Sequence, residues 1–255
     1  MPTDVTRDDL GHPLEPFAAA GPARRVVSLV PSITESLASV DPGSIVGATD
    51  WCTHPTDLDV PRVRGTKNPD VAKIAQLSPD LVIANKEENR ELDVRRLRER
   101  GVRVWVTDIE TVPQALSSLG RLFDEALRWP RPSWLEAATE LWTAPMPPVH
   151  RRVAIPVWRD PWMVVGSRTF TGDLARRLGL DNVYADHPER YPSLDVADLD
   201  AAGADAILLP DEPYVFTSAD GPEAFTLTPT ELVSGRLLTW YGPSLIDAHE
   251  SLARD

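Results

Sequence analysis

The sequence has a single cysteine, Cys52, so it cannot form an internal disulfide framework. Lysine is also scarce: only Lys67, Lys73 and Lys86 are present, and the formal net charge is −13. Nucleic acids and anionic membrane surfaces are bound through basic faces, so this composition argues against both as partners. No apolar run approaches the length of about 20 residues that a membrane-spanning helix needs, and we expect no membrane insertion.

The start of the chain lacks the features of an export signal. Residues 1–20 are acidic and contain prolines, without a basic start or an apolar core. No cysteine that could carry a lipid anchor lies there either. The sequence therefore predicts a cytoplasmic protein.

Motifs of several enzyme classes are missing as well, because we find no glycine-rich phosphate loop, nucleophile elbow or zincin motif. What is present is an alternation of short apolar runs with amphipathic segments, which predicts an α/β protein with mainly parallel sheets. At 255 residues, the chain can bury a substantial core as one large domain or two lobes. The strands predicted in the first half are 25–30, 45–48, 81–84 and 102–106.

The stretch from Pro61 to Arg90 reads as loop, helix, strand and loop. Asn68 is a suitable N-cap, with Pro69 in the first turn of the helix. The following run, 81–84, is continuously apolar, as expected for a strand covered on both faces. Ligands of open α/β sheets bind beyond the carboxyl ends of the strands, so the flanking loops 65–68 and 85–89 are predicted to meet a ligand.

Three segments of this stretch, GTKNPD, SPDLVIA and the EEN loop, resemble the helical-backbone metal receptor family. These proteins have the class III periplasmic-binding-protein fold and are relatives of the cobalamin-, haem- and siderophore-binding proteins of ABC importers. The resemblance extends from about Arg24 to the C-terminal helix, through VWRDPWMVVG, RLGLDNVY, ADAILLPDEPY and WYGP. It implies two Rossmann-like lobes joined by a long interdomain helix, which Pro130 and Pro132 are expected to kink or split.

The resemblance and the periodicity together predict the domain organisation. We expect an extended arm at residues 1–22, an N-terminal α/β lobe at 23–110, a helical linker at 111–148 and a C-terminal α/β lobe at 149–255. Ser32, with Glu35 three residues later, fits a capping box at the start of the first helix. The strands predicted in the second half are 152–158, 205–209 and 237–241, and the helices are 172–178, 194–202 and 244–253.

The loop after the second strand carries candidate ligand contacts. Trp51 offers a flat surface to a large ring. Cys52 and His54 could ligate zinc, copper or a cobalt centre, with a third ligand from Glu87, Glu88 or Asp211. Alternatively, Cys52 packs as a small apolar group and His54 bonds a loop carbonyl.

Glu87 and Glu88 could form a catalytic acid pair, contact a ligand or belong to a solvated loop. Adjacent carboxylates on an extended segment point apart, which argues against the catalytic pair. In the second lobe, Trp158 is predicted to face Trp51 across a cleft, and Arg159 could bind a ligand carboxylate or phosphate as a fork. The alternative is an Arg159–Asp160 surface pair with the tryptophans in the core. The predicted ligand-binding residues are Ser32, Asp50, Trp51, Thr66, Lys67, Asn68, Asn85, Glu87, Glu88, Trp158, Arg159, Phe170, Asp211, Glu212, Tyr214 and Trp240, and the candidate metal ligands are Cys52 and His54.

Transport relatives carry one surface glutamate on each lobe for docking on the permease. Ala72 and Arg168 occupy the equivalent positions here, although a short shift could recruit Asp70 or Asp173. An ABC permease is therefore not expected as a partner. The aromatic side chains that a cobalamin binder has in the GTKN loop and after the VIA strand are likewise replaced, so the ligand expected is a cobalamin-like molecule or another metal chelate.

The sequence thus predicts non-catalytic binding of such a small molecule between two lobes. No catalytic residue is assigned, and no cofactor apart from cobalamin or a metal chelate as the ligand. Two alternatives remain open. One is a cytosolic enzyme of small-metabolite biosynthesis that uses His54, Glu88 or Asp160 as acid or base. The other is an importer binding protein whose leader was removed.

Overall fold

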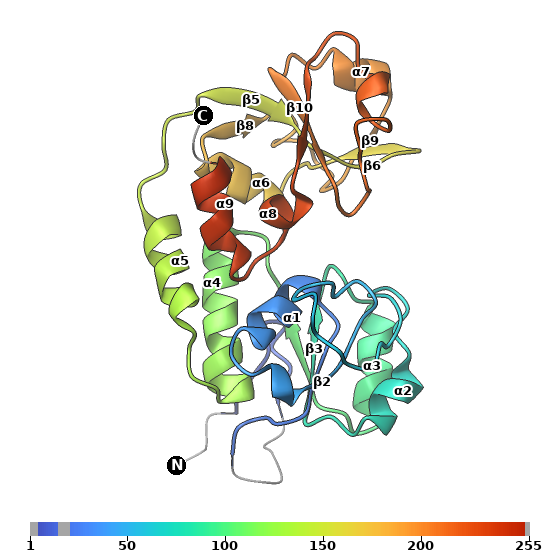
Figure 1. Ribbon diagram of the computed structural model, residues 1–255, viewed down its shortest axis with the longest axis vertical. Helices are drawn as coiled ribbons and strands as arrows, with labels where there is room; N and C mark the ends of the chain where they lie inside the picture. Colours follow the sequence, from blue (N-terminus) through green and yellow to red (C-terminus); the bar gives the residue numbers. More distant parts are fainter. Residues whose placement is uncertain (1–4, 15–20, 253–255) are drawn as a thin grey trace. The chain divides into compact units, whose positions relative to one another are not determined.

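The computed structural model describes residues 5–14 and 21–252 of the chain. The chain divides into two compact units, drawn in Figure 1. The first unit comprises Met1–Ile109, Gln114–Ala137 and Tyr241–Pro243, and the second comprises Glu110–Pro113, Ala138–Trp240 and Ser244–Asp255.

The first unit is built on a parallel sheet with strand order β2-β1-β3-β4. Its strands are β1 (Val26–Ser28), β2 (Ile45–Ala48), β3 (Leu81–Asn85) and β4 (Val104–Thr107). Its helices are α1 (Pro31–Ala38), α2 (Val71–Gln76) and α3 (Glu91–Glu99), with the 3-10 turn η1 (Pro42–Ser44). The predicted alternation of strands and helices is confirmed. Every strand of this sheet pairs with a parallel neighbour, as predicted.

Alternate residues of these strands face opposite sides of the sheet. Val82 and Ala84 pack in one apolar cluster with Ile74 of α2 and Leu97 of α3. The side chain of Trp105 points to the face of the sheet opposite that of its neighbours in β4. It is fully buried, and the Arg121 guanidinium lies 5.3 Å from the centre of its ring. Both faces of the sheet are therefore covered, as the apolar strand sequences predicted.

The helical linker is interrupted where the prolines predicted a break. Helix α4 (Val112–Arg121) continues into a π-helical segment, η2 (Leu122–Leu127), which ends at Arg128 in the left-handed region (φ 56°). Helix α5 (Ser133–Thr143) begins only after Pro130 and Pro132. Neither proline can donate an N–H to a helical hydrogen bond, so one continuous helix does not form.

The second unit contains two sheets. The parallel sheet has the order β11-β10-β5-β8, and a smaller antiparallel sheet has the order β6-β7-β9. The strands are β5 (Arg151–Ala154), β6 (Pro156–Trp158), β7 (Trp162–Val164), β8 (Leu180–Asn182), β9 (Ser193–Leu194), β10 (Ala206–Pro210) and β11 (Thr230–Val233). The helices are α6 (Phe170–Arg177), α7 (Val196–Asp200), α8 (Gly235–Thr239) and α9 (Ser244–Leu252), with the 3-10 turn η3 (Pro222–Ala224).

Two predictions for the second unit need adjustment. The strand predicted at 152–158 is split into β5 and β6, which belong to different sheets. The helix predicted at 194–202 is shorter, because Leu194 pairs with Trp162 in β7 and the helix starts only at Val196.

The strand predicted at 237–241 is wrong. Residues Gly235–Thr239 form helix α8, and the last strand of the described chain is β11. The run Leu-Leu-Thr-Trp-Tyr favours a strand by intrinsic propensity, but tertiary contacts override it. The Gly235 N–H donates to Asp211 Oδ1 (2.6 Å), and Thr239 Oγ1 donates to the Gly235 carbonyl (2.8 Å).

The predicted helix caps in the first unit are also wrong. Asp70, not Asn68, is the N-cap of α2, and its Oδ1 accepts the Lys73 N–H (3.0 Å). Helix α1 begins at Pro31 after Val30, without a side-chain capping bond, so Ser32 lies inside the first turn. The final helix begins at Ser244, and its predicted last residue, Ala253, lies outside the described residues.

The extended arm predicted at 1–22 is wrong for residues 5–14, which turn back on themselves through a bridge between Arg7 and Pro13. Asp8 is buried and pairs with Arg98 (2.7 Å), and Asp9 pairs with Arg121 (2.8 Å). These ion pairs hold the segment on the first unit. Residues 1–4 and 15–20 of the predicted arm lie outside the described residues.

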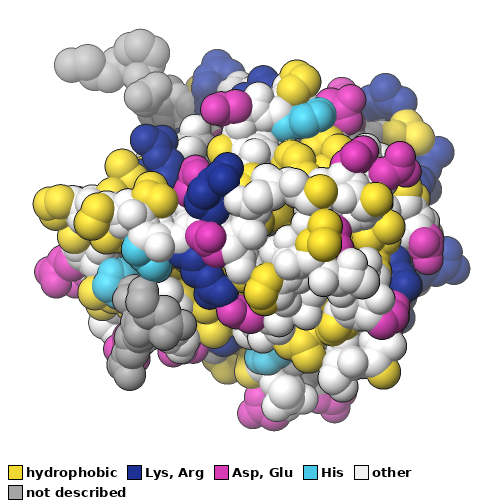
Figure 2. All heavy atoms as spheres, turned by 90° about the horizontal axis from the view of Figure 1, so that it is seen from above, with side chains coloured by type: hydrophobic (Ala, Val, Ile, Leu, Met, Phe, Trp, Pro, Cys, Tyr) yellow, Lys and Arg dark blue, Asp and Glu magenta, His cyan; other side chains and the backbone are white. Residues whose placement is uncertain are grey.

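Two features of the structure bear on the partners expected from the sequence. None of the helices in the described part of the chain is both long and apolar enough to cross a bilayer. On the face drawn in Figure 2, lysine and arginine side chains are interspersed with acidic and apolar ones and do not gather into one continuous basic patch.

Candidate functional site

The carboxyl edge of the first unit's sheet brings together most of the residues predicted for this half of the chain. Because the strands are parallel, the segments that follow β1, β2 and β3 all start at the same edge. These segments are the first turn of α1, the loop 49–55 and the loop 85–89. We call this edge, with the adjoining loop 65–68, the first-unit site.

Trp51 presents the largest exposed apolar side chain of this site, with 63% of its surface accessible. A Cβ atom at Gly65 would lie 3.3 Å from Trp51 Nε1 and 2.6 Å from Asn68 Oδ1, so only glycine permits this close approach. The Asp50 N–H donates to the Arg64 carbonyl (2.9 Å), which joins the two loops through the backbone. The tryptophan is thus held against the loop 65–68 with its ring open to solvent.

Two asparagines fix the loop that follows β3. Asn85 Oδ1 accepts the N–H groups of Glu87 (2.8 Å) and Glu88 (3.1 Å), while its Nδ2 donates to Thr107 Oγ1 (3.1 Å). Asn89 Nδ2 donates to the Thr66 carbonyl (2.9 Å). Asn85 is buried, so it orients the loop from inside instead of offering its amide to a ligand.

The lysines of these loops are engaged by the loops themselves. Lys67 Nζ donates to the Glu87 carbonyl, and Lys86 Nζ forms an ion pair with Asp108 (2.7 Å). The Lys67 bond connects the loops 65–68 and 85–89 a second time. The two ligand loops predicted from the sequence therefore form one cross-linked structure.

Tyr241 is a residue of the first-unit site that the sequence analysis missed. It is buried, and its hydroxyl donates to Glu88 Oε1 over 3.5 Å. Burial, and next the negative charge of Glu88, raise the pKa of Tyr241 well above its ordinary value, so the phenol keeps its proton. No sequence signal placed it here, because residue 241 is more than 150 positions from Glu88.

Cys52 and His54 do not form a recognisable metal centre. The Cys52 thiol is fully buried, and Thr34 Oγ1 donates to its sulfur over 3.0 Å. His54 Nδ1 lies 3.1 Å from Thr53 Oγ1. Within residues 5–14 and 21–252, no three histidine, cysteine, aspartate or glutamate side chains are grouped to hold a metal ion. The arrangement favours the packing interpretation of Cys52.

We expect the Cys52 thiol to resist modification in the folded protein. Its burial raises its pKa, which lowers the fraction of reactive thiolate at neutral pH. Alkylation by iodoacetamide at pH 8, followed by mass spectrometry, should be at least about tenfold slower for the native protein than for the protein in 6 M guanidinium chloride. Equal rates would show that the thiol is accessible, and Cys52 would again be a candidate metal ligand.

In the second unit, Trp158 and Tyr214 lie in contact, with ring centres 5.6 Å apart in an edge-to-face arrangement. Trp158 is 44% exposed. The Tyr214 hydroxyl donates to Asp220 Oδ2 (2.6 Å). Like Trp51 in its own unit, Trp158 offers an exposed aromatic surface whose orientation is set by neighbours.

Arg159 is already bound by acidic side chains of its own unit. Its guanidinium pairs with Asp220 and Glu223 and lies 5.4 Å from the centre of the Trp162 ring. The hydrogen bond to Glu223 raises the pKa of Arg159 further. The predicted fork therefore faces protein carboxylates, and the alternative Arg159–Asp160 pair is only a long contact of 3.9 Å.

The remaining predicted residues of the second unit support its fold. Asp211 accepts the Gly235 N–H, and Glu212 packs so closely on Gly235 that a Cβ there would lie 2.4 Å from Glu212 Cγ. Phe170 and Trp240 are both more than nine-tenths buried. Less than one-tenth of the surface of either side chain is therefore open to a ligand.

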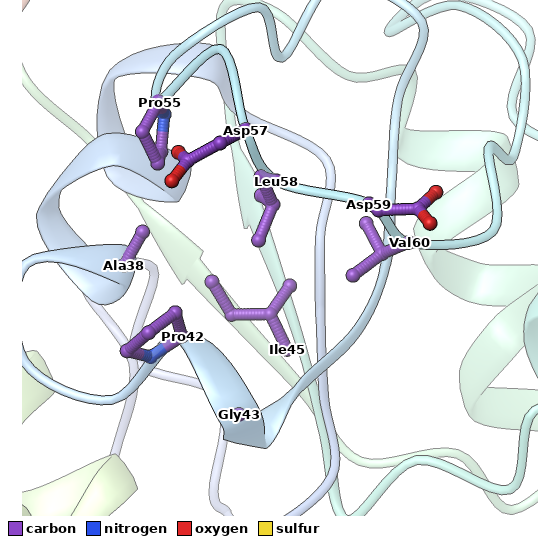
Figure 3. Close-up of a pocket in the computed structure, with 9 residues that line it drawn as sticks. All are labelled: Ala38, Pro42, Gly43, Ile45, Pro55, Asp57, Leu58, Asp59 and Val60. Carbon is purple, nitrogen blue, oxygen red and sulfur yellow. The ribbon is translucent and has the colours of Figure 1, made fainter.

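A separate hollow of the first unit, shown in Figure 3, has a volume of about 670 Å³ and contains none of the predicted site residues. It lies between the end of α1, the turn η1 and the loop 55–60. In Figure 3 the Asp57 carboxylate points toward Pro55, and the Asp59 carboxylate points in the other direction. The lining residues are Ala38, Pro42, Gly43, Ile45, Pro55, Asp57, Leu58, Asp59 and Val60.

Comparison with known proteins places this geometry in context. Residues 26–126 match the family model described as "Periplasmic binding protein". A vitamin B12-binding protein of Salmonella typhi is 25% identical over 181 residues, which cover 68% of this chain and 66% of that protein. The match thus spans slightly less than two thirds of the length of this relative.

Solved structures share the fold over nearly the whole chain. The periplasmic vitamin B12-binding protein BtuF of Vibrio cholerae superposes with a TM-score of 0.70 at 18% identity, over 91% of this chain and 96% of the other. A periplasmic haem-binding protein from Pseudomonas aeruginosa gives a TM-score of 0.73 at 22% identity, over 91% of each chain. These likenesses confirm the class III periplasmic-binding-protein fold predicted from the sequence.

Proposed function

From the premise that this chain has the fold of the class III periplasmic binding proteins, we propose that it binds a cobalamin-like molecule or another metal chelate without catalysis. The observation that carries the proposal is Trp51, an exposed ring fixed beside the loops 65–68 and 85–89 at the carboxyl edge of a parallel sheet. A planar ligand can cover such a ring without needing one particular polar partner. The relatives named for vitamin B12 and haem support the same ligand class.

We further propose that the protein stores, delivers or senses its ligand and does not dock on an ABC permease. Ala72 and Arg168 are exposed, and neither is acidic. Asp70 caps α2, while Asp173 accepts the Val112 N–H (2.8 Å) and pairs with Arg177 (2.7 Å). Asp70 and Asp173 are thus both engaged by groups of the protein itself, which supports the proposal that neither docks on a permease.

Titration of the purified protein with chelates tests the proposed function. Dicyanocobinamide and hemin absorb visible light, so binding can be followed by their spectra and by quenching of tryptophan fluorescence. We expect saturation at one equivalent for at least one of the two. If neither ligand changes the spectrum or the fluorescence, the proposed function is wrong. The predicted cytoplasmic location requires a separate measurement, fractionation of cells that express the chain from its own gene.

A further inference from the structure

The connection between α5 and β5 is an exposed apolar segment. Residues 144–149, which we call the proline segment, have the sequence APMPPV, and all six are exposed. No charged, hydroxyl or amide side chain occurs among them. Met146 is 48% accessible and Val149 is 61% accessible. Single exposed apolar side chains are common on proteins, whereas a contiguous exposed patch marks an interaction site.

Three prolines restrict the backbone of the proline segment before any partner is present. Pro145, Pro147 and Pro148 have φ fixed at about −65° and no N–H to donate. The residues that precede them, Ala144, Met146 and Pro147, are confined to extended and polyproline II conformations. The segment accordingly forms neither helix nor strand, and Figure 1 draws it as an open trace from α5 to β5. The sequence therefore favours a polyproline II helix here.

The spacing of the side chains suits recognition in that conformation. A polyproline II helix has three residues per turn, so side chains three positions apart lie on the same face. Pro145 and Pro148 then share one face, and Met146 and Val149 share the next. Aromatic-lined grooves of peptide-binding domains recognise a Pro-x-x-Pro motif of this kind. The flat faces of tryptophan and tyrosine in such a groove provide a large apolar contact area for the proline rings.

Both ends of the proline segment are fixed by the second unit. Trp142, just before the segment, is buried, and its Nε1 donates to the Leu245 carbonyl (2.9 Å). The Trp142 carbonyl accepts a hydrogen bond from Arg177 (3.1 Å). Just after the segment, the His150 N–H donates to the Gly179 carbonyl (3.0 Å). A segment held at both ends loses less conformational entropy on binding than a free peptide does.

We propose that the proline segment is the docking site for a protein partner whose aromatic-lined groove binds a polyproline II helix. This inference goes beyond the proposed function, because the first-unit site belongs to the other compact unit. The alternative role of the segment is that of a rigid spacer. A spacer needs the stiffness of the prolines but not the exposed side chains of Met146 and Val149, so substitutions separate the two roles.

Titration of the whole chain with purified groove domains tests this inference. The probes are an SH3 domain, a WW domain and an EVH1 domain, which bind proline-rich segments in aromatic-lined grooves. We expect calorimetry to show binding of at least one of them with a Kd of about 100 µM or lower. The double variant Met146→Ser, Val149→Ser keeps all three prolines and should bind that domain at least about tenfold more weakly.

A matched variant controls for the loss of apolar surface. Val215 and Leu227 are 63% and 72% accessible and lie outside helices and strands. The double variant Val215→Ser, Leu227→Ser should therefore keep the wild-type affinity for the groove domain. Both double variants replace exposed side chains, so their melting temperatures should stay close to that of the wild type.

A peptide of residues 142–151 provides a test that does not depend on any variant. It should compete with the whole chain for the groove domain. If none of the three domains binds the wild type, if the peptide does not compete, or if Met146→Ser, Val149→Ser binds as tightly as the wild type, the inference is wrong. Chelate binding is measured separately, so each of these results leaves the proposed function as it stands.

Discussion

Replacing Trp51 with alanine is expected to weaken binding of dicyanocobinamide or hemin by about tenfold or more, because the ring provides the main exposed apolar surface of the first-unit site. The affinity would be measured by the visible titration described above. Since 63% of the side chain is already accessible, its removal should leave the melting temperature nearly unchanged.

A matched variant sharpens this result. Trp51→Phe keeps an aromatic face of smaller area, so its affinity should lie between those of the wild type and Trp51→Ala. An unchanged affinity in Trp51→Ala, with the fold intact, would contradict a ligand at the carboxyl edge of the first sheet. Binding would then have to be sought elsewhere, beginning with the hollow beside Leu58.

The second large effect concerns stability and depends on Asp200 at the end of α7. Its carboxylate accepts the N–H groups of Thr226 (2.8 Å), Leu227 (3.0 Å) and Thr228 (2.9 Å). Asp200→Ala leaves these donors without their acceptor, so we expect the free energy of unfolding to fall by about 2–4 kcal/mol. Urea denaturation followed by circular dichroism measures this loss.

The same carboxylate makes part of the stability depend on pH. Burial acts to raise the pKa of Asp200, but the backbone N–H bonds outweigh it and lower the pKa overall. A lowered folded-state pKa stabilises the protein fully above the unfolded-state value of about 3.9, and this contribution disappears as the pH falls through the folded-state value. The difference between the wild type and Asp200→Asn should therefore be largest near pH 7 and shrink in acid.

Asp198→Asn is the control for this pH dependence. Asp198 lies on the same helix and is exposed, so its replacement should change stability by less than about 0.5 kcal/mol at any of these pH values. If the wild type and Asp200→Asn differ by the same amount at pH 7 and at pH 3, the hydrogen bonds do not act through the charge of the carboxylate.

The errors of the sequence analysis have two physical causes. The segment 237–241 was assigned to a strand by propensity, but the Asp211 carboxylate starts a helix at Gly235. Asn68 was a sound choice for a cap, yet Asp70 reaches the Lys73 N–H. The contact of Asp211 with Gly235 joins residues 24 positions apart, which local propensity does not encode, whereas the Asp70 cap joins residues three positions apart and was a competing local choice.

The sequence by itself determined the parallel α/β architecture, the interrupted linker and the loops at the carboxyl edge of the first sheet. Apolar runs, their periodicity and the prolines are local properties, and they survive in any tertiary arrangement. Only the tertiary structure decided what those loops contain: it buried Asn85 and Cys52, bound Arg159 to acids of its own unit, and brought Tyr241 to Glu88. Such roles depend on which distant groups become neighbours, and that information arises only when the chain has folded.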